Sequence, residues 1–290
     1  GQAQKCSNLV EIYIMSSRLE LKLSACMLYV YSNLTLGNAK ASGRGLEIIR
    51  ECLRKEMEAP TSERNTAYCV FAGYMGTVLL HLSTEELPDM KKYMSSLPQG
   101  LRIFAANVIS HDLYLKGEYS RALGICDAAL FSCKEIYPVG MIYLYCVTAM
   151  CEISLKNQAE AEKAILTAWE LAEKDELIEP FIELHGLLQG LLESCIRKEN
   201  PEMYRKISNA VITFSRGWMA VHNPASDRPV TDALTTMEFS IAMLACRDWS
   251  NREIAEHIGV SLNTVKHYLT DIFNKLHVKK RDELKNFVLK

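Results

Sequence analysis

The sequence predicts an all-α protein in which a helical-hairpin repeat domain is followed by a small four-helix domain. Apolar residues recur three and four positions apart along nearly the whole chain, which is the spacing of one face of an α-helix. Val, Ile and Thr rarely alternate with polar residues at the period of two that marks a strand. Near the C-terminus, several helix-start signals follow one another closely, which indicates short helices separated by tight turns.

The composition is that of a folded globular chain. The 290 residues are 49% hydrophobic and 23% charged, with a formal net charge of −2, and they allow two or three domains. No stretch approaches the roughly 20 apolar residues of a membrane span. Residues 1–11 lack the basic-then-apolar order of a signal peptide. We therefore expect a cytoplasmic protein that does not interact with membranes, and the start at Gly1 suggests that upstream sequence is missing.

The ten cysteines are scattered, and no two of them form a Cys-x-x-Cys pair. Most stand among apolar residues, as Cys26 and Cys146 do, where cysteine usually acts as a small buried hydrophobe. We therefore expect reduced thiols, no bound metal and no cofactor.

Turn-forming residues divide the first two hundred residues into helices of roughly ten to twenty residues. The expected breaks fall near 37–45, 59–63, Pro88, 98–100, 116–118, 138–140, Pro180 and Pro201.

Three segments of this region match one another in register. They are Gly45-Leu46 with Cys52-Leu53, Ala122-Leu123 with Ala129-Leu130, and Ala161-Glu162 with Ala168-Trp169. Small residues seven positions apart share one helix face and let a neighbouring helix approach closely. The spacing of the copies predicts a fourth, weaker copy near 85–94. The preceding turns at 116–119 and 156–159 suit a left-handed helix stop. A helix-pair solenoid fits this pattern, and an irregular helical bundle with chance similarity is the alternative.

The last copy continues to Leu-Ala-Glu173 and is followed by Pro180-Phe181 and then Gly186. Over roughly 115–200 the chain resembles the TPR-like helical-repeat region of MalT-like regulators. The resemblance implies a region that senses a ligand or a protein partner, with a DNA-binding module after it. Residues 216–231 contain two prolines and no helical periodicity. We therefore predict a repeat domain at 1–215, a linker at 216–231 and a DNA-binding domain at 232–290.

The C-terminal domain carries dense capping signals. Thr235 with Glu238 and Ser250 with Glu253 have the spacing of capping boxes, Ser261 is a further N-cap, and Gly259 suits a helix stop. These signals predict helices at 235–247, 251–258 and 262–277, and a fourth after Lys279. The short turn between the second and third predicts a helix-turn-helix, in which the second of the pair enters the major groove.

The helix at 262–277 has two contrasting faces. At 100° per residue, the apolar side chains gather on one side, and the opposite side carries groups that hydrogen-bond bases or phosphates. The apolar set is Val265, Leu269, Ile272, Phe273 and Leu276, and the polar set is Asn263, Lys266, His267, Thr270 and Asn274. No acidic residue lies within the polar face, although an ordinary amphipathic surface helix would tolerate one.

The amino-acid sequence of this region closely resembles that of the LuxR-type DNA-binding domain. The matching stretches are Leu234-Thr235 with Glu238, Ser250-Asn251-Arg252-Glu253-Ile254-Ala255, Val260-Ser261, Thr264-Val265-Lys266, and Lys275-Leu276-His277-Val278 with Arg281. The resemblance places Lys266, His267 and Thr270 in the major groove, and the polar face adds Asn263 to the candidates for base contacts. The candidates for phosphate contacts are Asn251, Arg252, Thr264, Asn274 and Lys275. The apolar Ile254, Ala255, Val265 and Leu276 are expected to form the core of the module.

The resemblance also implies pairing through the last helix, about 281–288. Its apolar positions Leu284, Phe287 and Val288 suit a small docking face. We therefore predict a homodimer on double-stranded DNA with an inverted-repeat operator. The sequence departs from the usual family residues at Met237, Asp248, Tyr268 and His277, so the target sequence is not transferable.

No catalytic motif accompanies these features. The histidines are dispersed, and there is no nucleophile elbow and no phosphate-binding glycine-rich loop. We expect a transcription regulator rather than an enzyme, with an unidentified small-molecule or protein effector acting on the repeat domain. Two alternatives remain: a repeat scaffold for protein–protein binding, and the C-terminal part of a larger MalT-like ATP-dependent regulator.

Overall fold

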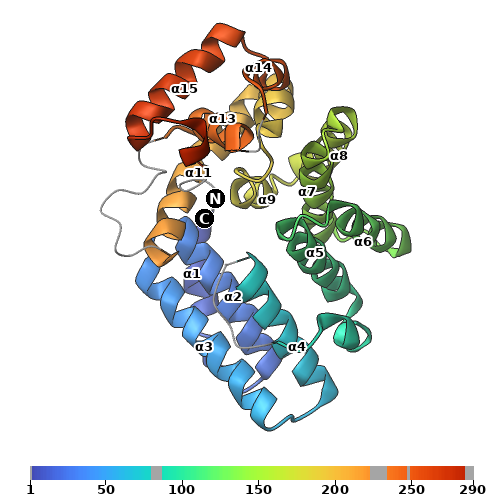
Figure 1. Cartoon of the computed structure of the whole chain (residues 1–290). Helices are drawn as coiled ribbons and strands as arrows, with labels where there is room; N and C mark the ends of the chain where they lie inside the picture. The colour runs from blue at the N-terminus through green and yellow to red at the C-terminus, as the bar shows by residue number, and fades with distance from the viewer. Residues whose placement is uncertain (1, 80–86, 223–233, 247–248, 285–290) are drawn as a thin grey trace. The chain divides into compact units, whose positions relative to one another are not determined.

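The computed structural model describes residues 2–79, 87–222, 234–246 and 249–284 (Figure 1). Every regular element in these ranges is helical, which confirms the all-α prediction. The chain divides into two compact units, one formed by residues 1–144 with 217–224 and the other by 145–216 with 225–290. Within the described ranges, no helix combines the length and apolar character needed to cross a membrane.

The first unit is built mainly from antiparallel helix pairs. Its elements are α1 (Ala3–Glu11), α2 (Leu19–Thr35), α3 (Ala39–Glu58), α4 (Glu63–Tyr74), the π-helix η1 (Met75–Leu79), the 3-10 helix η2 (Met90–Ser96), α5 (Gln99–Leu115), α6 (Tyr119–Ser132) and the start of α7 (Pro138–Ser154). Tight turns connect α2 to α3 and α5 to α6, and each of these two pairs packs side by side.

The matched small residues lie where these helices are closest. Gly45 of α3 faces α2, and a Cβ added there would lie 2.7 Å from Cγ2 of Val30. Ala122 of α6 and Ala161 of the later helix α8 are fully buried. The first small position of each copy is therefore buried, whereas the second position is buried at Ala168 and only half-buried at Cys52 and Ala129. The expected fourth copy differs, because its described residues, 87–94, contain part of the 3-10 helix η2 and no α-helix.

The helix stops follow the predicted chemistry. Gly37 and Gly117 adopt left-handed backbones with φ of 70° and 75°, and Lys156 does so with φ of 64°. A glycine or a polar residue in this conformation closes the last helical turn. Each turn predicted to hold a left-handed stop, 116–119 and 156–159, therefore contains one, at Gly117 and at Lys156.

The second unit holds the end of α7 and all later elements. These are α8 (Gln158–Glu173), α9 (Glu179–Glu183), the π-helix η3 (Leu192–Ile196), α10 (Arg197–Glu199), α11 (Pro201–His222, up to residue 216), α13 (Thr236–Cys246), α14 (Asn251–Ile258), α15 (Leu262–Leu276) and the 3-10 helix η4 (Arg281–Leu284). Helix α11 runs into the segment predicted as a linker as far as His222, and residues 223–231 of that segment lie outside the described residues.

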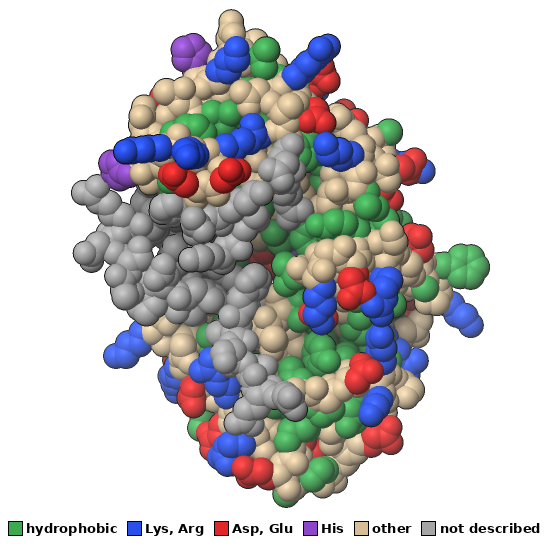
Figure 2. Space-filling view, viewed as in Figure 1, with side chains coloured by type: hydrophobic (Ala, Val, Ile, Leu, Met, Phe, Trp, Pro, Cys, Tyr) green, Lys and Arg blue, Asp and Glu red, His purple; other side chains and the backbone are tan. Residues whose placement is uncertain are grey.

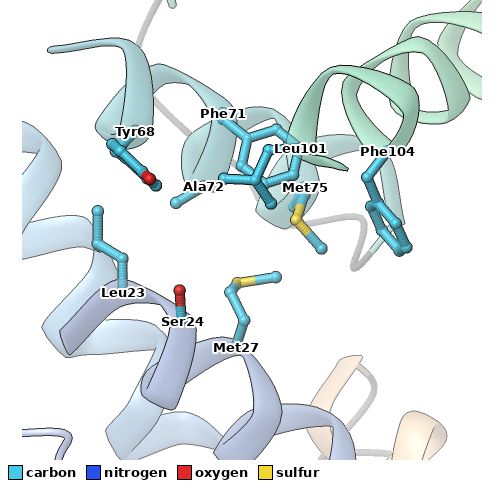
Figure 3. Close-up of a pocket in the computed structure, with 9 residues that line it drawn as sticks. All are labelled: Leu23, Ser24, Met27, Tyr68, Phe71, Ala72, Met75, Leu101 and Phe104. Atoms are coloured by element: carbon cyan, nitrogen blue, oxygen red, sulfur yellow. The ribbon is translucent and has the colours of Figure 1, made fainter. Parts of the chain in front are cut away.

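A small cavity lies between α2, α4, η1 and α5 in the first unit (Figure 3). It measures about 190 Å³, and Met27, Phe71, Met75 and Phe104 are among the side chains that line it. Tyr68, which carries a hydroxyl group, also lines it. Because most of the lining side chains are apolar, the cavity is strongly apolar.

Most of the cysteines are buried, as their apolar neighbours in the sequence predict. None of the ten is bonded to another, seven are buried, and the other three are half-buried. Burial raises the pKa of the Cys26 and Cys69 thiols to about 12, which makes these two thiols poor nucleophiles near neutral pH.

Candidate nucleic-acid interface

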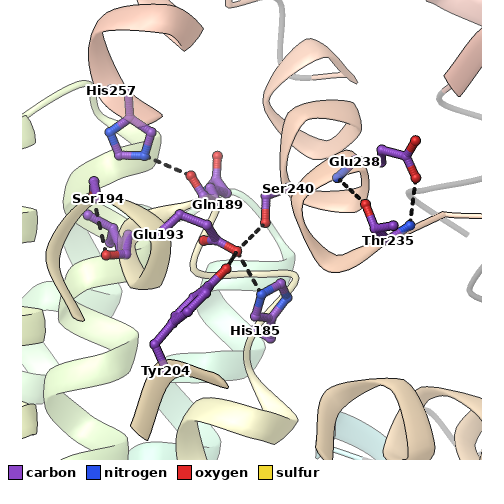
Figure 4. Close-up of polar contacts among 10 residues, drawn as sticks. His185, Gln189, Glu193, Ser194, Tyr204, Thr235, Glu238, Ser240 and His257 are labelled. Atoms are coloured by element: carbon purple, nitrogen blue, oxygen red, sulfur yellow. Dashed lines mark hydrogen bonds and ion pairs between the residues drawn. The ribbon is translucent and has the colours of Figure 1, made fainter. Parts of the chain in front are cut away.

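Helix α13 begins with the first predicted capping box. The Thr235 amide donates to Glu238 Oε2 at 2.7 Å, and the Glu238 amide donates to Thr235 Oγ1 at 3.3 Å (Figure 4). Burial alone would raise the pKa of Glu238, but the bonds from Lys275 and Thr235 outweigh it and lower that pKa. The capping carboxylate is therefore charged at neutral pH.

Helices α14 and α15 form the predicted helix-turn-helix. Ser250 and Glu253 make a complete capping box at the start of α14, and Gly259 ends that helix with a left-handed φ of 72°. Ser261 then caps α15 by accepting a bond from the Thr264 amide at 3.1 Å. The bonds from Ser250, together with Lys156, lower the pKa of Glu253 to about 2. All three predicted N-caps and the glycine stop are confirmed.

The apolar face of α15 forms the centre of this module. Val265, Ile272 and Ile254 are fully buried, and Ala255 and Leu276 are nearly so. Helices α13, α14 and α15 all contact one another. The predicted core residues are therefore buried, and they orient α15 so that its other face points away from the module.

The opposite face of α15 is open to solvent. Asn263, Lys266, His267, Thr270 and Asn274 are all exposed, as predicted from their positions around the helix. Figure 2 shows basic and histidine side chains on the surface in the region of α15. The Thr270 hydroxyl donates to the Lys266 carbonyl at 2.9 Å, and the side chains of the other four are directed to solvent. The four candidates for base contacts therefore lie on one accessible surface.

The candidates for phosphate contacts are less uniform. Arg252 is exposed and pairs with Glu256 at 3.0 Å. Thr264 is half-buried and shares a 2.7 Å hydrogen bond with the Ser261 hydroxyl. The Asn251 side-chain oxygen accepts a bond from Arg281 at 3.0 Å. These three side chains surround the starts of α14 and α15, where backbone amides also point outward.

Lys275 has a structural partner that its sequence position did not predict. Its ammonium contacts both oxygens of Glu238 at 2.6 and 2.7 Å, and the Glu238 side chain is only 5% exposed. The pair ties the end of α15 to the start of α13. A phosphate bound by Lys275 would therefore have to share its ammonium with Glu238.

Arg281 is a second residue whose structural role the sequence did not predict, although it belongs to the stretch that resembles the LuxR-type domain. Besides Asn251, it donates to the carbonyls of Ala245 and Trp249. The guanidinium thus joins the end of α13, the start of α14 and η4. The nearby Leu284, expected on a pairing face, is fully buried within its own chain, and Phe287 and Val288 lie outside the described residues.

A short-turn helix pair with a buried inner face and an exposed polar outer face defines a helix-turn-helix DNA-binding domain. Residues 232–288 match the family described as "Bacterial regulatory proteins, luxR family". The chain thus carries a LuxR-family helix-turn-helix domain, in agreement with the resemblance seen in its sequence. Comparison with curated proteins and with solved structures gives no match.

Proposed function

We propose that this protein is a sequence-specific transcription regulator that reads the major groove with α15. The observation that carries the proposal is the exposed polar face of α15 on a LuxR-family domain. Its amide, ammonium, imidazole and hydroxyl groups match the donors and acceptors on base edges. Asn263, Lys266, His267 and Thr270 are the proposed base contacts.

Phosphate contacts would set the register of the domain on the duplex. We assign these to Asn251, Arg252, Thr264, Asn274 and Lys275, although Lys275 also holds Glu238. Each cationic contact to a phosphate releases counterions, so the affinity should fall steeply as salt rises. We also propose that two copies bind an inverted-repeat operator, because paired helix-turn-helix domains read paired half-sites.

We further propose that the helical region senses an effector and that the protein acts in the cytoplasm and has no enzymatic activity. The apolar cavity of about 190 Å³ supports a small apolar ligand, since a cavity of ~150 Å³ already accommodates benzene. A protein-binding scaffold is a second candidate. It is favoured by Phe131 and Ile136, whose side chains are 95% and 74% exposed.

The decisive experiment selects bound duplexes from a random pool with the full chain at two salt concentrations. We expect an enriched inverted repeat whose affinity falls as salt rises. Lys266→Ala should weaken binding to that site by about 5- to 150-fold, because one good base contact contributes about 1–3 kcal/mol. The matched control is Lys163→Ala on α8, whose side chain is 76% exposed and lies outside the module. If no duplex is enriched at either salt concentration, the regulator proposal is wrong and the scaffold is favoured.

A further inference from the structure

The segment 185–197, here called the docking platform, lies against α13 and α14 within the second unit. Two of its glycines make room for side chains of the helix-turn-helix. A Cβ at Gly186 would lie 2.5 Å from Cε1 of Phe239, and one at Gly190 would lie 3.3 Å from Ile258. Gly190 also has φ of +86°, which other residues rarely adopt. The platform is therefore shaped to receive the domain closely.

A buried carboxylate lies at the centre of this contact. Glu193 is 1% exposed, and its Oε1 lies 3.0 Å from Nε2 of His185 and 3.3 Å from the Tyr204 hydroxyl. The Ser240 hydroxyl of α13 donates to the same oxygen at 3.2 Å (Figure 4). Burial alone would raise the pKa of Glu193, but His185, its own backbone amide and the Ser240 hydroxyl outweigh it and hold the pKa below its ordinary value. Ser240 therefore joins the domain to a charged acceptor on the helical region.

A second polar contact joins the platform to α14. The Nε2–H of His257 donates to the Gln189 carbonyl at 2.8 Å, and Arg197 donates to the Ile258 carbonyl at 3.4 Å. Gln189 has a left-handed φ of 52°, which is unfavourable for a residue with a side chain. The surrounding packing therefore holds this turn in the conformation that presents its carbonyl to His257.

A third contact lies at the edge of the interface. The Lys156 ammonium is 3.1 Å from Oε1 of Glu253, and it also lies over the Trp249 ring at 5.8 Å from the centroid. Contacts from the platform and from Lys156 thus reach both α13 and the start of α14. The outer face of α15 remains exposed, so docking and base reading use different surfaces.

We propose that the docking platform holds the helix-turn-helix in its DNA-binding orientation and that the Glu193–Ser240 hydrogen bond is a positioning contact for DNA binding. This inference rests on the proposed function. A binding surface that is already oriented loses less conformational freedom on binding, so a docked domain binds more tightly than a loosely tethered one. An effector that displaces the platform would then lower DNA affinity without touching α15.

The test compares two full-length variants that each remove one hydrogen bond from Oε1 of Glu193. Ser240→Ala removes the bond that crosses to α13, and Tyr204→Phe removes one within the helical region. Two measurements are made: amide hydrogen exchange at 188–196 and 254–258, and affinity for the selected duplex.

Ser240→Ala should speed exchange in both segments and weaken DNA binding by about three- to tenfold, the range of one net hydrogen bond. Tyr204→Phe should leave exchange at 254–258 and DNA affinity within about twofold of the wild type. Unchanged or tighter binding by Ser240→Ala, or equal effects of both variants, would overturn the inference. If the wild type binds no duplex, the proposed function fails as well, and faster exchange in Ser240→Ala would still identify the contact.

Discussion

The helix starts of the C-terminal module and of the helical region that precedes it are capped to different extents. Helices α13, α14 and α15 each begin with a side-chain hydroxyl that caps a backbone amide. In the helical region before it, α2, α5, α6 and α8 begin without a side-chain cap, whereas α3 and α4 begin with caps from Asn38 and Ser62. The left-handed Gly37 and Gly117 follow α2 and α5. The difference teaches that local caps define the start of every one of these three helices in the DNA-binding domain, whereas several helices of the preceding region depend on contacts between helices.

The largest expected change in stability comes from adding a methyl group at a glycine that packs against the C-terminal module. Gly186→Ala should destabilise the second unit by about 1–3 kcal/mol, because its Cβ would lie 2.5 Å from the Phe239 ring. Gly124→Ala in α6 should instead stabilise by about 0.5–1 kcal/mol, since a Cβ there meets nothing within 4 Å. Urea unfolding of both variants measures the sign of each change in the free energy of unfolding. If Gly186→Ala were as stable as Gly124→Ala, the platform would accommodate the added methyl group without a loss of stability.

Substituting an N-cap residue in each region should give a stability change of intermediate size. Ser250→Ala should cost about 1 kcal/mol, because it removes the hydroxyl that accepts the Glu253 amide at 3.2 Å. Asn157→Ala at the N-cap of α8 should cost less than about 0.5 kcal/mol, because that side chain makes no cap bond. Thermal unfolding of the two variants provides the measurement. A larger loss for Asn157→Ala would contradict the distinction between local and tertiary specification.

The smallest expected effect is a dependence on pH. Burial lowers the pKa of His257 below its ordinary value of 6.5, even though the bond to Gln189 opposes the shift. Below that ordinary value the unfolded chain binds a proton that the folded chain does not, so stability falls as pH decreases through this window. Above about pH 6.5 both states are neutral at this residue, and its contribution is fully present.

Unfolding measured between pH 7.5 and 5.5 should show a shallower decline in His257→Gln than in the wild type, because glutamine does not titrate. His267→Gln is the matched control, since His267 is exposed on α15. Identical slopes in the wild type and His257→Gln would exclude His257 as the source.

Sequence reasoning succeeded where one residue type demands one local geometry. The capping boxes, the stop at Gly259 and the two faces of α15 were all predicted from spacing, and the structure confirms them. It failed where the partner lies far along the chain. Nothing near Lys275 indicates that Glu238 holds it, and nothing near Glu193 indicates a bond to Ser240. The irregular turn with left-handed Gln189 and Gly190 also carried no recognisable signal.

The sequence by itself determined the helical class, the helix-turn-helix and the face of α15 that is exposed to solvent. Each of these depends on residues within a few positions of one another, where backbone geometry and periodicity leave few alternatives. The tertiary structure alone decided that Glu193 is a buried acceptor for Ser240, that Gly186 makes room for Phe239 and that Leu284 is buried in its own chain. These contacts join residues distant in sequence, and only the packing of whole helices brings them together.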